Sequence, residues 1–482
     1  MRLRHAAALS LRLSQFGNKM SGHRADAVAR AYAGFDDGRY LQLLRRLVAV
    51  PTESQVPSRL PELYRYCREA VAPLLADLGF ETAVLDNPLS GAGPVMLASR
   101  MEQPERPTVL IYGHGDVVRG LDSEWRAGLD PWQVTADGQR LYGRGTADNK
   151  GQHLIAIEAL RAVLQERGSL GFNAKVLIET GEEVGSPGLG DFLMQHQESC
   201  AADVFIGLDG PRQTTSVPEL RLGARGGIAF DLVVKLREGA HHSGHWGGVL
   251  ADPGFILAHA LATIVSATGQ IQVEGWTPNK IPDAVRRACS ALVFEDLPDL
   301  PQADPNWGEP GLNKAEKIFA WTSAVVLAYR TGHPDGPTNA VQPEARARLQ
   351  VRHTVDVDGA GIIPALRQHL DKLGFQAVKI EPVEGRDVFL ASRTDPGDPW
   401  VHRIASSMEH TTRRSPNIVP NSSGGNPSRL FADALGIPVI WIPNSYAGCN
   451  QHAPNEHALA PLLREGLGVM AGIWWDIGSG QQ

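Results

Sequence analysis

The order of helical and β-rich segments is the feature that most constrains the fold of this chain. Apolar residues recur at helical spacing in residues 39–50, 60–80 and 150–165. Short β-rich runs accompany them at residues 82–85, 95–98, 109–112, 175–178 and 204–207. Because strands separated by helices form parallel sheets with both faces covered, this region predicts an α/β domain with a mostly parallel central sheet.

The pattern changes near residue 221 and returns near residue 400. Residues 221–236, 345–355 and 377–383 resemble antiparallel strands, and residues 251–268 and 361–372 have helical spacing. Residues 276–310 are rich in proline and predict only a loop, whereas a buried strand at 437–443 and a helix at 461–477 restore the first pattern. We therefore expect one domain, residues 1–216 and 392–482, to be interrupted by an α+β domain of residues 217–391.

Composition and charge exclude several classes of protein. Hydrophobic residues make up 43% of the chain and charged residues 21%, which is typical of globular proteins and not of disordered or collagen-like ones. The 53 acidic and 46 basic residues give a formal charge of −7. Charge alone therefore does not favour a nucleic acid or an anionic membrane as partner. No apolar run approaches the roughly 20 residues of a membrane-spanning helix.

The cysteines and the amino terminus bear on location. Four widely spread cysteines form no CxxC pair, which favours a reducing compartment, and we expect a cytoplasmic protein. Residues 1–19 are basic and lack the apolar core of a secretory signal. They resemble a transit segment or an over-long start before Met20, and we favour the second interpretation.

Two acid-bearing segments follow predicted strands directly. His114 and Asp116, in YGHGDVV, come after strand 109–112, where His114 could offer one ring nitrogen to a metal while Asp116 holds the ring. Asp209, in FIGLDG, ends the strand 204–207. The alternatives are a strand-end histidine beside a solvated aspartate, and a turn aspartate before glycine.

Two further segments concentrate carboxylates. In YGRGTADNKG, glycines on both sides of Asp148 let the backbone bend closely around one carboxylate at a helix start; the alternative is a helix N-cap. No GxGxxG follows a strand, so a Rossmann dinucleotide site is not indicated. Glu182 and Glu183, in IETGEEVGS, are adjacent carboxylates that need a positive group nearby unless they lie in a solvated helical turn.

A histidine completes the set. His452, in QHAPNEH, lies ten residues beyond the buried strand, with His457 as an alternative and Cys449 as a conceivable thiolate ligand. In chain order the five segments supply His, Asp, Glu, Asp and His, that is, two histidines and three carboxylates. If one carboxylate bridges, each of two metals receives one histidine, one terminal carboxylate and the shared one, with a position left open for water.

These motifs together resemble the dinuclear zinc carboxypeptidase, dipeptidase and aminoacylase family, which includes carboxypeptidase G, acetylornithine deacetylase, succinyl-diaminopimelate desuccinylase and carnosinase. The matching order is H-x-D, G-R-G-x-x-D-x-K-G, E-E-x-G-S, D and H-x-P-N-E, and the resemblance covers most of residues 38–475. It implies a zinc-peptidase-like domain interrupted by a ferredoxin-like lid that also dimerises.

The resemblance also implies a role for each residue of the metal site. His114 and Asp209 would bind one ion, Glu183 and His452 the other, and Asp148 would bridge the two. Asp116 would orient His114. Glu182 would be the general base for a metal-bound water. Zinc is the expected metal, with cobalt or manganese as alternatives.

Residues of the lid are implicated in the same way. HHSGHWGG resembles the carnosinase-type H-S-G-x-x-G-G motif and assigns His242 to the histidine that stabilises the oxyanion from the partner subunit. The alternatives for His241, His242 and His245 are a solvated loop or an extra metal site. Asn339 and Arg352 match substrate-binding positions, and Arg352 could clamp a substrate carboxylate or be a strand-surface charge.

One segment departs from the family pattern. Many relatives have R-x-G-G-S-x-P before the last strand, whereas this chain has NSSGGNPSRLF, without the arginine. Gly424, Gly425 and Asn426 still suit a loop around a carboxylate or acyl group, so we expect them to bind substrate.

The function expected from these residues is metal-dependent hydrolysis of a peptide-type amide in a small substrate. A dipeptidase or carboxypeptidase is favoured, and an N-acyl-amino-acid deacylase is the alternative. A catalytically inactive metal-binding relative is a distant third, because Glu182 and every ligand are present. A serine hydrolase would need G-x-S-x-G, which is absent. The expected partners are a small peptide or N-acyl amino acid and a second copy of the chain.

Overall fold

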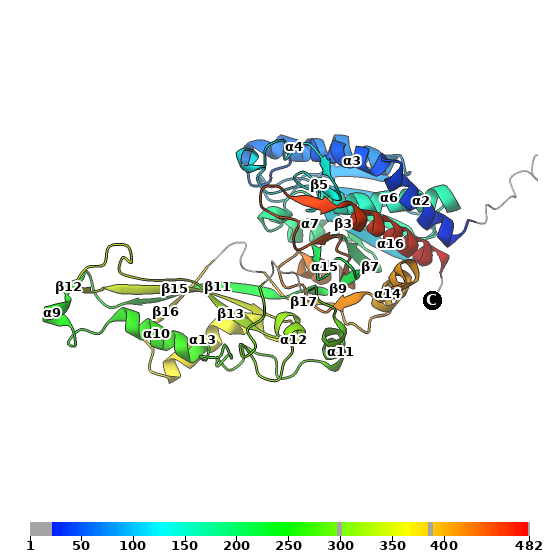
Figure 1. Cartoon of the computed structure of the whole chain (residues 1–482). Helices are drawn as coiled ribbons and strands as arrows, with labels where there is room; N and C mark the ends of the chain where they lie inside the picture. Colours follow the sequence, from blue (N-terminus) through cyan, green and yellow to red (C-terminus); the bar gives the residue numbers. More distant parts are fainter. Residues whose placement is uncertain (1–21, 296–300, 384–388, 481–482) are drawn as a thin grey trace, which may run out of the picture.

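A computed structural model describes residues 22–295, 301–383 and 389–480 of the chain. The expectation for residues 1–19 therefore lies outside the described residues. Two bodies are visible in Figure 1: a layered α/β domain and an elongated domain that projects from it.

The α/β domain is built on an eight-stranded sheet in the order β1-β2-β6-β3-β7-β19-β9-β18. Its inner strands β6, β3, β7 and β19 are parallel, and antiparallel pairs join β1 to β2, β2 to β6 and β19 to β9. The prediction of a mostly parallel central sheet is confirmed. In sheet order the strands are Glu81–Leu85, Val95–Arg100, Asn173–Glu179, Thr108–His114, Val204–Gly207, Val439–Trp441, Glu219–Arg221 and Asn417–Val419.

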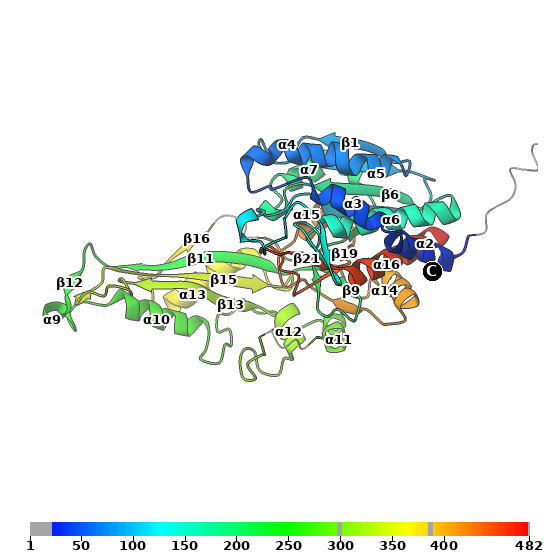
Figure 2. The ribbon, with the colours of Figure 1, turned by 45° about the horizontal axis from the view of Figure 1, so that its top comes forward.

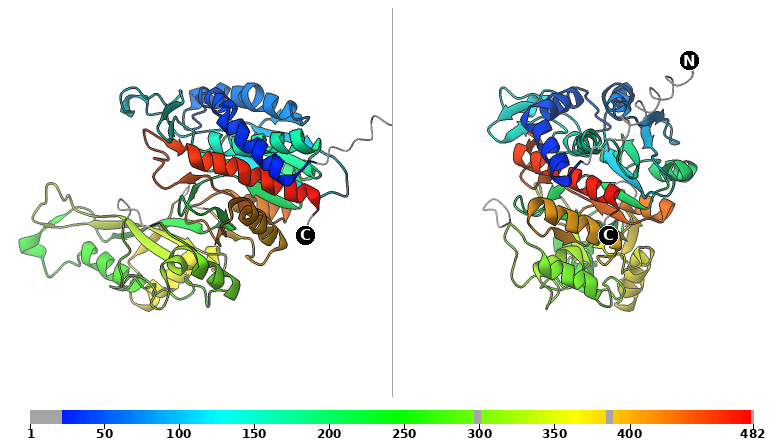
Figure 3. Two further views of the ribbon diagram at one scale, coloured as in Figure 1. Left: turned by 45° about the vertical axis from the view of Figure 1, so that its right-hand side comes forward. Right: turned by 90° about the vertical axis from the view of Figure 1, so that its right-hand side faces the viewer.

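Helices cover both faces of this sheet because its strands are apolar on both faces. On β3, Val109 and Ile111 pack into one core and Leu110 and Tyr112 into another. The first core lies under the larger layer: α2 (Arg24–Asp36), α3 (Arg39–Val48), the helical stretch 60–76, α6 (Lys150–Arg167), α14 (Pro399–Thr412) and α16 (Ala460–Ser479). The second lies under α7 (Leu189–Gln195), α8 (Gln197–Cys200) and α15 (Ser428–Leu435). Figure 3 shows α2 and α16, from opposite ends of the chain, packed side by side.

The projecting domain has the ferredoxin-like arrangement that the resemblance implied. Its four antiparallel strands lie in the order β13-β15-β11-β16 (Ser323–Thr331, Glu344–His353, Gly226–Lys235 and Lys379–Pro382). Helices α10 (Pro253–Ile264) and α13 (Ile362–Lys372) pack on one face through a common apolar core (Figure 2). Short strands β10 (Gly223–Ala224) and β17 (Ser392–Arg393) pair where the chain passes between the two domains.

The loop expected at residues 276–310 is partly wrong. It contains α11 (Asp283–Ala291), which is followed by α12 (Lys314–Phe319). Val285 and Cys289 on α11 pack with Phe319 against Val419 of β18, so burial against the α/β domain stabilises a helix too short to show in the sequence pattern. Within the described parts of the chain, no helix is long and apolar enough to span a membrane.

Candidate metal centre

The predicted ligands meet at one edge of the central sheet. β3 ends at His114, β6 is followed by the turn Glu182–Val184, and β7 is followed by Asp209. Asp148 lies two residues before the start of α6, and His452 lies in the loop after β19. Because β6, β3, β7 and β19 are parallel neighbours, their carboxyl ends face the same side and bring these segments together.

The ligands form two groups that share Asp148. In the first, the Nε2 atom of His114 lies 3.0 Å from Oδ1 of Asp148 and 4.0 Å from Oδ1 of Asp209. In the second, the Nε2 atom of His452 lies 3.1 Å from Oδ2 of Asp148 and 3.1 Å from Oε2 of Glu183. Within each group the ligand atoms lie within 4.8 Å of one another. Asp148 therefore turns one carboxylate oxygen toward each group, as a bridging ligand would.

Asp116 contacts residues of both ligand groups. It is fully buried, and its Oδ1 atom lies 3.4 Å from Nδ1 of His114. Its carboxylate also accepts hydrogen bonds from the backbone N–H groups of Glu182 (3.2 Å) and Glu183 (3.1 Å). The Asp116 carboxylate thus contacts His114 of the first group and the backbone of Glu183, which belongs to the second group.

The pKa values of the predicted ligands and of Glu182 are shifted because these groups are buried close together. Burial raises the pKa of Glu182, of Glu183 to about 7, and of Asp209. Contacts with Asp148 and Glu183 raise the pKa of His452 to about 11. A positive charge placed among these groups would offset the cost of burying their carboxylates together.

The remaining two ligands respond in opposite directions to burial. Burial lowers the pKa of His114, but its contacts with Asp116 and Asp148 outweigh burial and raise the pKa well above the usual range. Burial raises the pKa of Asp148, but its contacts with His114 and His452 outweigh burial and lower it. Imidazole nitrogens and carboxylate oxygens in this arrangement fit a pair of divalent ions.

Glu182 lies where two cavities meet. The cavities have volumes of about 500 and 610 Å³, and both are lined by Glu182, Gly425, Asn426 and His452. The first cavity is also lined by Asp148 and Asp209, by Gly424 and by residues of the segment between α10 and β13, among them Phe294, Glu295 and Lys314. The second is also lined by Arg352, Phe389 and Leu390.

Four of the residues predicted to bind substrate line one or both of these cavities: Arg352, Gly424, Gly425 and Asn426. The Arg352 guanidinium lies over the Phe389 ring, 5.3 Å from its centroid, and its Nη1 atom lies 3.5 Å from the Ser423 carbonyl oxygen. At Gly425 a Cβ atom would come within 2.7 Å of the Phe389 ring, so only glycine lets the loop approach this closely. Asn426 accepts a hydrogen bond from the backbone N–H of Ser428 (3.1 Å).

His242 and Asn339 are not brought to this site. They lie at the far end of the projecting domain, where the Ser243 N–H donates to the Asn339 carbonyl oxygen (2.9 Å). Figure 1 shows β12 (His241–His242) and α9 (Ser243–Trp246) at the tip farthest from the α/β domain. The His242 ring stacks on His245 at 4.5 Å between centroids, and both side chains are exposed.

Two alternatives from the sequence lie outside the ligand groups. The Nε2 atom of His457 lies 2.6 Å from the Tyr446 hydroxyl oxygen, and its Nδ1 atom lies 3.0 Å from the Asn455 carbonyl oxygen. Cys449 is buried, and the structure places it in neither of the two ligand groups found among the described residues.

Two polar residues at the centre were not identified from the sequence. Asn149 donates to Oδ1 of Asp209 (2.8 Å) and to the Leu208 carbonyl oxygen (2.7 Å), which ties the loop after β7 to the start of α6. Gln451 donates to Oδ2 of Asp148 (2.5 Å). Each is adjacent in sequence to a predicted ligand, and that adjacency was the only available signal.

Comparisons with known proteins agree with this geometry. The family model "Peptidase family M20/M25/M40" matches residues 110–476. The chain is 27% identical over 380 residues to a cysteinylglycine-S-conjugate dipeptidase of Corynebacterium striatum, covering 77% of this chain and 80% of the relative. It is 30% identical over 494 residues to a beta-Ala-His dipeptidase of Rattus norvegicus, covering 94% and 96%. The crystal structure of an M20 family metallo-carboxypeptidase from Sulfolobus solfataricus has the same fold, with a TM-score of 0.73 and 23% identity, covering 91% of this chain and 99% of that one.

Proposed function

The chain belongs to peptidase family M20/M25/M40, and from this premise we propose how its residues cleave a dipeptide. It is a metallopeptidase that hydrolyses peptide bonds. The observation that carries the proposal is the position of Glu182, beside two ligand groups that share Asp148 and at the junction of two cavities.

Catalysis needs an attacking water, a polarised carbonyl and a proton for the leaving nitrogen. Two divalent ions, held by His114 and Asp209, by Glu183 and His452, and by Asp148 between them, would lower the pKa of the water and polarise the carbonyl. Glu182 then accepts the water proton and delivers it to the leaving amine. Burial raises the pKa of Glu182, and a more basic carboxylate is a better acceptor for the water proton.

The two cavities separate the halves of the substrate. Arg352, in the 610 Å³ cavity, binds the C-terminal carboxylate, since a guanidinium matches a carboxylate in bidentate geometry. Glu295 and Lys314, in the 500 Å³ cavity, face the N-terminal residue. Charged groups there suit a residue with a free amino group better than an apolar acyl chain, which favours a dipeptide.

An N-acyl-amino-acid deacylase is the second candidate. The observation in its favour is the segment NSSGGNP, which lacks the arginine that many relatives carry before the paired glycines. One cationic contact to a substrate carboxylate would be missing there, so recognition would depend more on Arg352.

Zinc is the metal we propose, because two imidazoles and three carboxylates leave an open coordination position on each ion, as catalytic zinc sites do. Cobalt or manganese is the alternative.

We also propose a cytoplasmic location, since all four cysteines are buried and free of disulfides. We place the second domain limit at 391/392 and move the first from 216/217 to beyond Arg221, because β9 (Glu219–Arg221) belongs to the central sheet.

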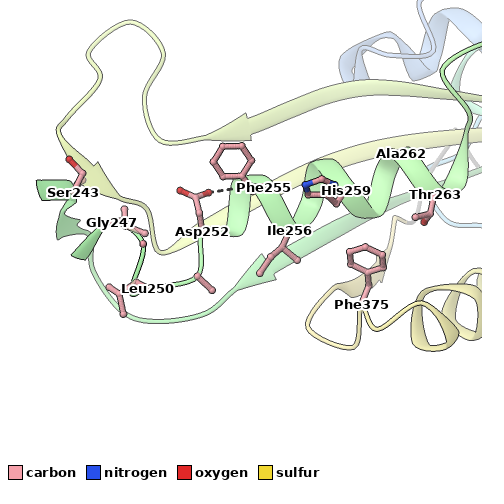
Figure 4. Close-up of a pocket in the computed structure, with 14 residues that line it drawn as sticks. Ser243, Gly247, Leu250, Asp252, Phe255, Ile256, His259, Ala262, Thr263 and Phe375 are labelled. Atoms are coloured by element: carbon pink, nitrogen blue, oxygen red, sulfur yellow. Dashed lines mark hydrogen bonds between the residues drawn. The ribbon is translucent and has the colours of Figure 1, made fainter. Parts of the chain in front are cut away.

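A homodimer through the lid accounts for the position of His242. Among the strands that the structure describes, β13 pairs only with β15, so it is an edge strand of the lid sheet, and its Val325 and Leu327 side chains are about half exposed. A groove of 910 Å³ also runs along α10 of the lid, and it is lined by Phe255, Ile256 and Phe375 (Figure 4). An exposed apolar face of this kind is typical of a subunit interface. The partner's His242 would then reach the metal centre and stabilise the oxyanion.

The experiment that tests the function is a digest of mixed substrates. Zinc- or manganese-loaded protein is incubated with a pool of dipeptides and N-acyl amino acids, and mass spectrometry follows each compound. We expect specific dipeptides to disappear and N-acyl amino acids to persist. Loss of acyl amino acids alone would establish the deacylase, and loss of neither class would contradict both.

A further inference from the structure

One buried carboxylate close to the metal centre has no part in the mechanism above. Glu456 is only 1% exposed and lies four residues after His452 in the same loop. Its Oε1 atom accepts hydrogen bonds from the backbone N–H groups of Gly145, Ala147 and Asp148, each at 3.0 Å. Three donors from one loop thus converge on a single oxygen.

The loop that contains His452 and Glu456 contacts both the backbone and the side chain of Asp148. The backbone of Asp148 is fixed by the Glu456 carboxylate, and its side chain lies 3.1 Å from the Nε2 atom of His452. The Gly143 N–H also donates to the Glu456 carbonyl oxygen (3.0 Å). The loops that carry His452 and Asp148 are therefore joined through Glu456, so a change at Glu456 alters the position of both ligands together.

We propose that Glu456 is a positioning residue for the shared carboxylate: by fixing the Asp148 backbone it holds Asp148 where both ligand groups can use it. This inference rests on the proposed ion pair but not on the identity of the substrate. The Glu456 carboxylate contacts the backbone of Asp148 but belongs to neither group of ligand atoms, so it acts on the metal centre indirectly, through the two loops that it joins.

The Glu456 carboxylate also pairs with a buried arginine, and this ion pair must be considered when a variant is chosen. Its Oε2 atom accepts from Nη1 of Arg144 (2.8 Å), and Arg144 is fully buried with its Nε and Nη2 atoms unpaired among the described residues. In Glu456→Gln, the single amide oxygen can face either Arg144 or the three backbone N–H groups but not both, and the arginine charge would lose its counter-charge. Some loss of stability is therefore expected whatever the role of Glu456.

A matched control separates positioning from stability. Glu158, on α6, is 2% exposed and forms an ion pair with Nε of Arg161 at 3.0 Å. Glu158→Gln therefore also removes a buried, arginine-paired carboxylate from the α/β domain, but one that contacts no ligand loop. Both variants are expected to unfold at a lower temperature than the wild type.

The experiment measures zinc affinity directly, by competition with a chromophoric chelator, at a temperature where each variant is folded by circular dichroism. We expect Glu456→Gln to lose about 10- to 100-fold in affinity for at least one of the two ions, as outer-shell substitutions do. Glu158→Gln should retain wild-type affinity.

Wild-type affinity in folded Glu456→Gln, or an equal loss in both variants, would overturn the inference. If Glu456→Gln does not fold, the double variant Arg144→Met/Glu456→Leu removes both charges and the acceptor oxygen, and it should show the same loss of affinity. Because no substrate is present, the result does not depend on whether the protein is a dipeptidase or a deacylase.

Discussion

Substituting Asp116 with asparagine isolates one support of the metal centre while preserving its size. In the wild type the two carboxylate oxygens accept from the backbone N–H groups of Glu182 and Glu183, and Oδ1 also faces Nδ1 of His114. An asparagine has only one oxygen. Its NH₂ group must therefore face one of the two N–H donors, which is left without an acceptor.

The size of the effect follows from that lost acceptor. An unsatisfied buried N–H costs about 1–3 kcal/mol. At about 1.4 kcal/mol per tenfold change, this corresponds to roughly 5- to 150-fold in an equilibrium constant. Because the affected loop carries Glu183, and the His114 ring loses a charged partner, most of the loss should appear as weaker metal binding.

The assay is zinc competition on folded protein, followed by kcat/KM for a cleaved dipeptide at saturating zinc. Asp231→Asn is the matched control: Asp231 is also a buried carboxylate with two donors, Arg346 (2.8 Å) and Arg348 (2.7 Å), but it lies in the lid. We expect Asp116→Asn to lose about 10- to 100-fold in metal affinity and Asp231→Asn to lose none. Equal affinities in the two variants would refute the role given to Asp116.

Three further predictions concern the partner subunit, pH and substrate choice. Mixing inactive His242→Ala with inactive Glu182→Gln subunits should restore part of the activity after verified subunit exchange; no recovery would argue against action of His242 across the dimer. Burial raises the pKa of Glu179 to about 7, although Tyr112 and Ser186 donate to it. A raised carboxyl pKa contributes stability that is complete below about 4.5 and lost as pH rises through 7. Glu179→Gln should therefore gain stability relative to wild type in denaturant titrations between pH 5 and 8, and a pH-independent difference would contradict this assignment. Lys314→Glu should shift kcat/KM by about 2- to 5-fold from dipeptides with an acidic N-terminal residue toward basic ones. The exposed lid variant Lys379→Glu should leave that ratio unchanged, and an equal shift in both variants would exclude a local effect of Lys314.

The metal centre could be predicted from sequence because its ligands follow apolar strands. A buried strand such as Thr108–His114 is recognisable from its own residues, and parallel strands bring the residues that follow them to one edge of a sheet. Local pattern and topology therefore suffice to place His114, Glu183 and Asp209 near one another. The ligand roles came from the resemblance, and the geometry is compatible with them.

Other features depend on contacts between distant parts of the chain. α11 is short, and it is stabilised by Val419, more than 120 residues away. The contacts of Glu456 with the loop before α6 span more than 300 residues, and no periodicity reports them. The remoteness of His242 from the metal centre depends on how the lid is oriented relative to the α/β domain, which local sequence patterns do not define.

The central claim is that a pair of ions binds and Glu182 performs the proton transfer. Its most direct test is a zinc titration of chelator-treated protein, in which bound zinc after desalting and dipeptide hydrolysis are measured in parallel for wild type and Glu182→Gln. We predict that both proteins bind two ions, that hydrolysis in the wild type follows zinc occupancy, and that Glu182→Gln loses about 10²- to 10⁴-fold in kcat. Hydrolysis that persists without metal, or that is undiminished in Glu182→Gln, would contradict the claim.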